Sequence, residues 1–84
     1  PASDKATVVV AECIQFGWQD ESVYGVDASG FKEPNGAGGF TVYTRGGDYF
    51  ADVQSAGAGS SIKYYAGEDT MPAKRRLAAL ATCL

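Results

Sequence analysis

The feature that most constrains the fold of this chain is a pair of alternating apolar and polar runs on either side of Gly46 and Gly47. Residues 40–53 have the sequence FTVYTRGGDYFADV. Strict alternation around two adjacent glycines is typical of a tight antiparallel hairpin. Counting outward from a pairing of Arg45 with Asp48 gives the rest of the register: Thr44 opposite Tyr49, Tyr43 opposite Phe50, Val42 opposite Ala51, Thr41 opposite Asp52 and Phe40 opposite Val53.

This register divides the hairpin into two faces, because successive side chains of a strand point to opposite sides. The apolar face is predicted to line the core and holds Phe40, Val42, Thr44, Tyr49, Ala51 and Val53. The mixed face combines aromatic with charged side chains and holds Thr41, Tyr43, Arg45, Asp48, Phe50 and Asp52. A slip of one residue would exchange the faces, so exposure of Val42 and Val53 would refute the register.

The first apolar segment, residues 6–16 (ATVVVAECIQF), is predicted to be a central strand covered on both sides. It is rich in β-branched and apolar residues, and such near-continuous runs are typical of strands in the middle of a sheet. Glu12 is the one charge on the face that holds Val8 and Val10. It therefore needs a partner, a place near the end of the sheet, or a bulge.

Residues 17–39 are predicted to be mostly loop, with a short strand over residues 22–26 and no helix. Pro34 disfavours a central strand, and Asn35 followed by Gly36 favours a turn. After a second glycine turn at residues 55–59, residues 60–66 are predicted to form the last strand.

The C-terminal residues predict a helix. Asp69 or Thr70 is a suitable N-cap, and Pro72 is tolerated in the first turn. Apolar side chains then recur at helical spacing: Leu77, Leu80, Ala81 and Leu84. The sequence thus predicts one α+β domain over residues 1–84, a small, mostly antiparallel sheet of four or five strands with one C-terminal helix packed on one face.

Cys13 and Cys83 stand near opposite ends of the chain. They are predicted to bond, because the helix must return along the first segment to bury its apolar stripe, provided their Cα atoms lie within about 7 Å. Such a bridge would contribute about 4 kcal/mol in the chain-entropy model and would favour an extracellular or other extracytoplasmic compartment. The alternative is two reduced thiols in a cytosolic protein. Pro1 fits either cleavage of a targeting segment or removal of an initiator methionine.

The sequence offers little for catalysis. It contains no histidine, the commonest general base and transition-metal ligand. The two cysteines lack the close spacing of a zinc site. Ser60 and Lys63 match a Ser-x-x-Lys motif, but that chemistry needs a helix start and further motifs. We therefore predict a protein that is not an enzyme and has no cofactor.

Residues 20–31 resemble an EF-hand calcium loop only in their first and sixth positions. Tyr24 and Phe31 stand at the fifth and twelfth positions, where oxygen ligands are required, so the match fails. A looser calcium site or ordinary solvated carboxylates would both account for the acidic side chains of this region: Asp20, Glu21, Asp27 and Glu33.

Net charge and hydropathy argue against two classes of partner, nucleic acids and membranes. Seven basic and ten acidic residues give a net charge of −3, whereas nucleic-acid affinity depends on basic side chains that neutralise phosphates. The basic residues 74–76 are explained by a solvated helix face. Apolar runs such as residues 8–11 are far shorter than the roughly 18 residues of a membrane span. Neither nucleic-acid binding nor membrane insertion is expected.

What remains is recognition through aromatic and arginine side chains, the types enriched in binding hot spots. The candidates are Trp18, Tyr43, Arg45 and Phe50, with Tyr65 as a further one. We predict a small extracytoplasmic binding module, such as an inhibitor, effector or toxin-like protein, that acts on a protein partner. The alternative is a small accessory or structural subunit of a larger assembly. A second layer or the long loop covering these rings would equally explain them.

Overall fold

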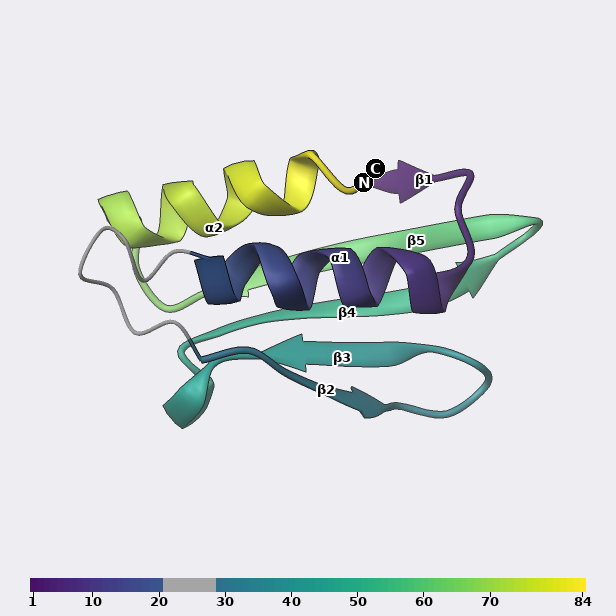
Figure 1. The fold of residues 1–84 in the computed structure, drawn as a ribbon, viewed down its shortest axis with the longest axis horizontal. Helices are drawn as coiled ribbons and strands as arrows, with labels where there is room; N and C mark the ends of the chain where they lie inside the picture. Colours follow the sequence, from purple (N-terminus) through teal and green to yellow (C-terminus); the bar gives the residue numbers. More distant parts are fainter. Residues whose placement is uncertain (21–28) are drawn as a thin grey trace.

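A computed structural model describes residues 1–20 and 29–84 of the chain. The elements follow in the order β1 (Ala2–Ser3), α1 (Thr7–Gln19), β2 (Phe31–Pro34), β3 (Phe40–Tyr43), the short 3-10 turn η2 (Arg45–Gly47), β4 (Tyr49–Ala56), β5 (Gly59–Ala66) and α2 (Met71–Ala81). The strands form one antiparallel sheet in the order β1-β5-β4-β3-β2 (Figure 1). The predicted α+β class and the C-terminal helix are confirmed, and α1 adds a second helix.

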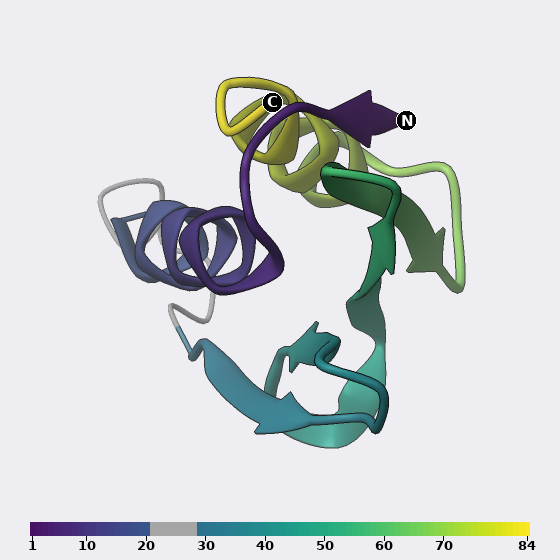
Figure 2. The same cartoon turned by 90° about the vertical axis from the view of Figure 1, so that its right-hand side faces the viewer.

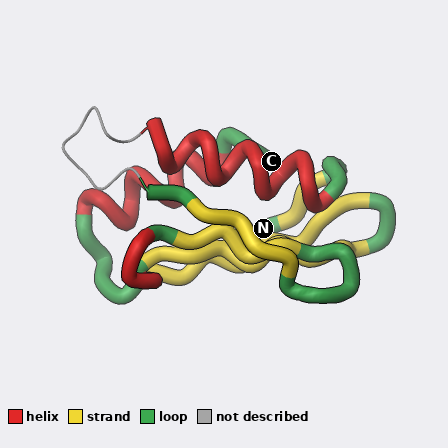
Figure 3. Tube along the Cα trace, turned by 60° about the horizontal axis from the view of Figure 1, so that its bottom comes forward, coloured by secondary structure: helices red, strands yellow, loops and turns green. Residues whose placement is uncertain are grey.

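Both helices pack on the same face of the sheet. Figure 2 shows α1 and α2 on the concave side of the curved sheet, and Figure 3 shows the helices above the strands. The core lies between these layers and joins side chains of both: Val10, Ala11, Ile14, Trp18 and Leu80 from the helices, and Val42, Ala51, Val53 and Ile62 from the strands. Among the described residues, no helix has the length and apolar character needed to span a membrane.

The prediction of a central strand at residues 6–16 was wrong, because this segment forms most of α1. With 3.6 residues per turn, one helix face gathers the side chains that become fully buried: Val10, Ala11, Ile14 and Trp18. The β-branched residues that suggested a strand include Val8 and Val9, which lie exposed on the other side. Burial of one helical stripe outweighs the β propensity of the segment, which depends strongly on context.

Glu12 needs no bulge, because it lies on the exposed side of α1. Its carboxylate forms an ion pair with the ammonium of Lys32 on β2, with an N–O distance of 3.1 Å. The presence of β2 corrects the prediction of a loop over this region. Pro34 is accommodated because β2 is an edge strand. The strand predicted at residues 22–26 lies outside the described residues.

The hairpin register is confirmed from the pair Phe40 and Val53 to the pair Tyr43 and Phe50. The Thr44 N–H donates to the Tyr49 carbonyl at 3.1 Å, so residues 45–48 form the turn and Arg45 does not pair with Asp48 as the sequence predicted. Gly46 and Gly47 adopt φ angles of 81° and 75°, which side-chain-bearing residues rarely tolerate. The predicted core face is correct at its centre, where Val42, Ala51 and Val53 are fully buried.

The C-terminal elements also follow the prediction. Strand β5 begins one residue earlier than expected, at Gly59, and α2 begins after Thr70. The Thr70 hydroxyl accepts a hydrogen bond from the Ala73 N–H at 3.3 Å, which satisfies an otherwise unpaired donor of the first turn. Leu80 is buried as expected, but Leu77 is exposed, and α2 packs beside α1.

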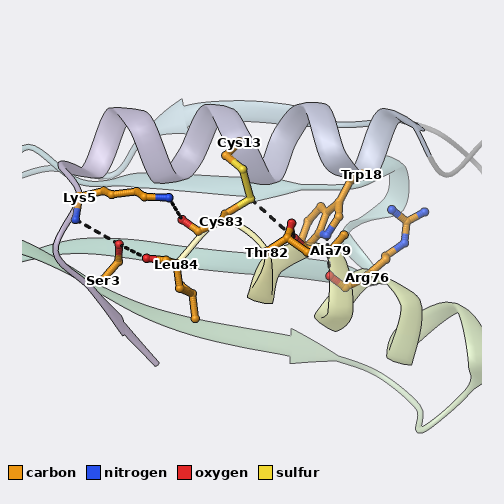
Figure 4. Close-up of a disulfide and its surroundings, with 9 residues drawn as sticks. All are labelled: Ser3, Lys5, Cys13, Trp18, Arg76, Ala79, Thr82, Cys83 and Leu84. Atoms are coloured by element: carbon orange, nitrogen blue, oxygen red, sulfur yellow. Dashed lines mark hydrogen bonds between the residues drawn. A yellow bond between two sulfur atoms is a disulfide. The ribbon is translucent and has the colours of Figure 1, made fainter.

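The predicted disulfide between Cys13 and Cys83 is present, with a Cα–Cα distance of 5.7 Å. It joins α1 to the residues that follow α2 (Figure 4). The Cys83 carbonyl also accepts a hydrogen bond from the Lys5 ammonium at 3.4 Å, and the Leu84 carbonyl accepts one from the Ser3 hydroxyl at 3.1 Å. These contacts hold the two ends of the chain together.

Candidate functional site

The sheet face opposite the helices carries four aromatic side chains, which we call the aromatic row: Phe31 on β2, Tyr43 on β3, Phe50 on β4 and Tyr65 on β5. The register aligns them, since each is the direct cross-strand partner of the next. Phe31 is 39% exposed and Tyr65 is 42% exposed, while the two central rings are half-buried. Within the described residues, neither helix covers this face. The aromatic row therefore forms a partly exposed apolar band across four strands.

The rings of the aromatic row form two stacked pairs. The centroids of Phe31 and Tyr43 lie 5.3 Å apart with an interplanar angle of 25°, and those of Phe50 and Tyr65 lie 4.6 Å apart with an angle of 19°. The guanidinium of Arg45 lies 6.0 Å from the Phe31 centroid, within the range of a cation–π contact. Since the rings pack face to face within each pair, much of their flat surface is already occupied.

A second row on the same face is polar. It consists of Glu33, Thr41, Asp52 and Lys63, which are cross-strand partners in that order. The Thr41 hydroxyl donates to the Asp52 carboxylate at 2.7 Å, and the Tyr43 hydroxyl donates to the Glu33 carboxylate at 2.8 Å. The latter bond, with burial and the carboxylate charge, raises the pKa of Tyr43 above its usual value. This polar row places charges of both signs beside the aromatic row.

Three of the four predicted binding residues, Tyr43, Arg45 and Phe50, come together on or beside this face. Trp18 does not, because it lies on the buried side of α1 and is fully inaccessible. Its indole N–H donates to the Arg76 carbonyl at 3.0 Å, so it joins the two helices instead of facing a partner (Figure 4). The placement predicted for Trp18 was wrong because α1 extends to Gln19, and Trp18 lies on its buried face.

Sequence reasoning missed Phe31, because residues 17–39 were expected to be mostly loop. The available signal was the alternation of Phe31, Lys32 and Glu33, which matches a short edge strand. This alternation is a weak signal, because a pattern of four residues that ends in proline is too short to distinguish a strand from a turn. Tyr65 was identifiable because the strand that carries it was predicted correctly.

Two of the four carboxylates considered for calcium, Asp20 and Glu33, lie within the described residues. Asp20 follows the last turn of α1, and Glu33 lies on β2. Glu21 and Asp27 lie outside the described residues. Within residues 1–20 and 29–84, no group of three or more His, Cys, Asp or Glu side chains is placed to hold a metal ion.

A cluster of polar and aromatic side chains lies between the helices and the inner face of the sheet. The buried Arg76 guanidinium is 4.9 Å from the Tyr49 ring centroid and 5.7 Å from that of Trp18. The Tyr64 hydroxyl donates to the Ala73 carbonyl at 2.7 Å. Burial raises the pKa of Tyr64 to about 12, Tyr49 adds to the shift, and Arg76 opposes it. The Tyr64 hydrogen bond fastens α2 to the sheet. Arg76 and Trp18 are fully buried, whereas Tyr49 and Tyr64 are half-buried.

Comparison of the chain with protein families, with characterised proteins and with solved structures found no match. A function must therefore be argued from the geometry and chemistry of the site itself.

Proposed function

We propose that this protein is a small non-enzymatic binding module that docks a protein partner on the aromatic row. The observation that carries the proposal is the alignment of four rings across four neighbouring strands, on a face that neither helix covers within the described residues. Contiguous exposed apolar surface marks interaction sites, and aromatic side chains are enriched at the centres of interfaces.

The chemistry around the row favours a protein over other ligands. Arg45 and Lys63 lie on the same side of the sheet as Glu33 and Asp52, so the rim has both signs of charge. A phosphate backbone would require a predominantly basic surface, and the chain has a net charge of −3. Bases or sugars stack on free ring faces, but these rings already stack on each other. An apolar centre with a mixed polar rim resembles a protein–protein interface.

The disulfide supports an extracytoplasmic location as part of this proposal. Disulfides persist in oxidising compartments and are rare in cytosolic proteins, and the bond between Cys13 and Cys83 closes nearly the whole chain. A secreted inhibitor, effector or toxin-like protein combines such a covalent closure with an exposed recognition surface.

The test compares two surfaces that expose aromatic rings. The double variant Phe31→Ser, Tyr65→Ser removes the most exposed ring of each stacked pair. The control, Phe16→Ser, removes a ring that is 57% exposed on α1. Each protein is immobilised, incubated with native extracellular extract and cross-linked. We expect a protein partner captured by the wild type and the control to bind the double variant at least about tenfold more weakly.

Trp18 fluorescence checks folding in every sample, because this residue is fully buried in the core. A partner that is lost with Phe16→Ser and kept by the double variant would move the interface to α1 and overturn the proposal. Binding of a single-stranded oligonucleotide or an oligosaccharide to the aromatic row would overturn the assignment to a protein partner.

One observation favours the alternative of an accessory subunit. The apolar side chains Val8, Val9 and Phe16 of α1 are also exposed, on a helix that packs on the other face of the sheet. A subunit covered from two sides would present apolar groups on both. Size-exclusion chromatography of the native protein distinguishes the two functions. A binding module elutes near its monomer mass, whereas a subunit elutes with a larger assembly.

A further inference from the structure

The edge of the sheet next to α2 is only partly paired. On one side of β5, all eight residues pair with β4. On the other side, β1 pairs only with Ser60 and Ser61, and the Pro1 carbonyl accepts the N–H of Ile62 at 2.8 Å. Among the described residues, no strand pairs with residues 63–66 on this side. Figure 1 shows β1 beside one end of β5 and α2 alongside the other.

The backbone groups that point to this open edge follow from the antiparallel pattern. Hydrogen-bonding directions alternate along a strand, so residues two apart direct their N–H and C=O groups to the same side. Ile62 donates away from β4, whereas Gly67 donates to the Asp48 carbonyl next to β4. Tyr64 and Ala66 therefore direct their backbone groups to the open edge, where they form a template for a further strand.

A groove lies directly beside this template. It has a volume of about 240 Å³ and lies between β5 and α2, with Ala66 on one wall and Ala73 and Leu77 on the other. Leu77 is 43% exposed at its rim. Pockets for small molecules usually measure about 300–1,000 Å³. This smaller, open groove suits individual apolar side chains that project from an added strand.

We propose that β5 binds an extended peptide segment of a partner protein by strand addition, antiparallel to β5 and in line with β1. Residues of the peptide opposite Tyr64 and Ala66 exchange backbone hydrogen bonds with them and project their side chains toward α2 and the groove. This mode draws affinity from main-chain bonds and specificity from pockets for alternate side chains. The site shares only Lys63 with the rim of the aromatic row, and its backbone and groove residues lie outside the row, so tests of the backbone bonds and of Leu77 are independent of the proposed function.

Charges at the two ends of the open edge define the polarity of the peptide. An antiparallel peptide begins near Glu68 and Asp69, which line the groove with Lys74, so two of the three charged groups there are acidic. The peptide ends opposite Lys63. A basic first residue and an acidic last residue therefore complement the site. Between them, residues at alternate positions are apolar. The occupant is thus an extended segment of the pattern basic, apolar, polar, apolar, acidic.

The probe for this site is the amidated peptide Lys-Val-Thr-Val-Glu, titrated into isotopically labelled protein and followed by NMR. We expect the amides of Tyr64 and Ala66 to gain protection from hydrogen exchange, since they acquire bonding partners. Methylation of the two valine nitrogens removes the donors that face β5 and should weaken binding roughly tenfold or more. Methylation of the threonine and glutamate nitrogens, which face away, is the matched control and should change affinity by less than about twofold.

Protein variants test the groove and the charge pairing separately. Leu77→Ser should weaken peptide binding about fivefold. Met71→Ser alters a 62% exposed side chain on the same helix outside the groove lining and should have no effect. Lys63→Glu should weaken the peptide and favour a version ending in lysine. Unchanged exchange at Tyr64 and Ala66 with saturating peptide, or equal binding of both methylated peptides, would overturn the proposal, as would equal binding to Leu77→Ser and Met71→Ser.

Discussion

The two faces of the sheet are made by alternate residues of the same strands and differ in burial. On the inner face, Val42, Ala51, Val53 and Ile62 are fully buried beneath two helices. On the outer face, their immediate neighbours form the aromatic and polar rows and remain partly exposed. Under the proposed function, the side chains that stabilise the core and those that bind a partner are therefore one residue apart along each strand. Substitutions on the inner face should therefore lower the free energy of unfolding, and substitutions on the outer face should weaken binding of the proposed partner.

The largest effect should come from the covalent bond on the helical side. The variant Cys13→Ser, Cys83→Ser removes a bridge between residues 70 positions apart. Because the bridge restricts the unfolded chain, its loss should cost about 4 kcal/mol of the free energy of unfolding, out of about 5–15 kcal/mol for a typical domain. Urea unfolding measures the change. Reduction of the wild type is the control, and a loss below about 1 kcal/mol would contradict the expected role.

Adjacent residues of β5 provide the most direct comparison of the faces. Ile62→Ala creates a cavity beneath the helices and should cost about 2–5 kcal/mol. Lys63→Ala alters an exposed side chain on the outer face and should stay within about 0.5 kcal/mol. Urea unfolding of the two variants under identical conditions checks the pair. Similar losses for both would mean that the outer face also belongs to a packed layer.

The hairpin could be predicted from sequence because its determinants are local. Alternation around Gly46 and Gly47 fixed the register, and the order of the pairs from Phe40 to Tyr43 was correct. The details of the turn were not, since residues 45–48 form a four-residue turn. A shift in turn type changes few contacts and leaves little trace in the hydrophobic pattern. The disulfide also followed from the sequence, although it joins the helix α1, and not a strand, to the residues after α2.

The first helix was misjudged because its core stripe overlaps a run of β-branched residues. Val8, Val9 and Val10 suit a strand, and only the spacing of Val10, Ile14 and Trp18 distinguishes a helix. That error affected the candidate site, because it left Trp18 on the surface. Tyr43 and Phe50 lie side by side as predicted, because their placement depends on the hairpin register alone. Arg45 lies beside them although the register fails in the turn that holds it.

The two central rings of the aromatic row, Tyr43 and Phe50, provide a further test of the difference between the two faces of the sheet. Tyr43→Ser with Phe50→Ser breaks both stacked pairs, which should cost at least about 1–3 kcal/mol, since each pair contributes about 0.5–1.5 kcal/mol in addition to its buried area. The domain should remain folded, because the core face is untouched, yet lose association with its partner. Circular dichroism and thermal unfolding measure the first outcome, and the cross-linking assay measures the second. An unfolded variant would place these rings in a second core layer.

The smallest effect concerns a polar group on the inner face. Tyr64→Phe removes the hydrogen bond to the Ala73 carbonyl and should cost about 0.5–1.5 kcal/mol at neutral pH. Because the pKa of Tyr64 is raised to about 12 in the folded protein, above its ordinary value of about 10, folding favours the protonated phenol. This contribution is fully present below about pH 10 and is lost as the pH rises toward 12. The difference in unfolding free energy between the wild type and Tyr64→Phe should therefore decrease across this pH range, as measured by urea unfolding. The other tyrosines and the lysines are the same in both proteins, so their titration cancels in the difference. If this difference in unfolding free energy stays constant from pH 8 to pH 11.5, Tyr64 ionises without loss of its packing. Water would then reach the inner face of the sheet more readily beside α2 than beside α1.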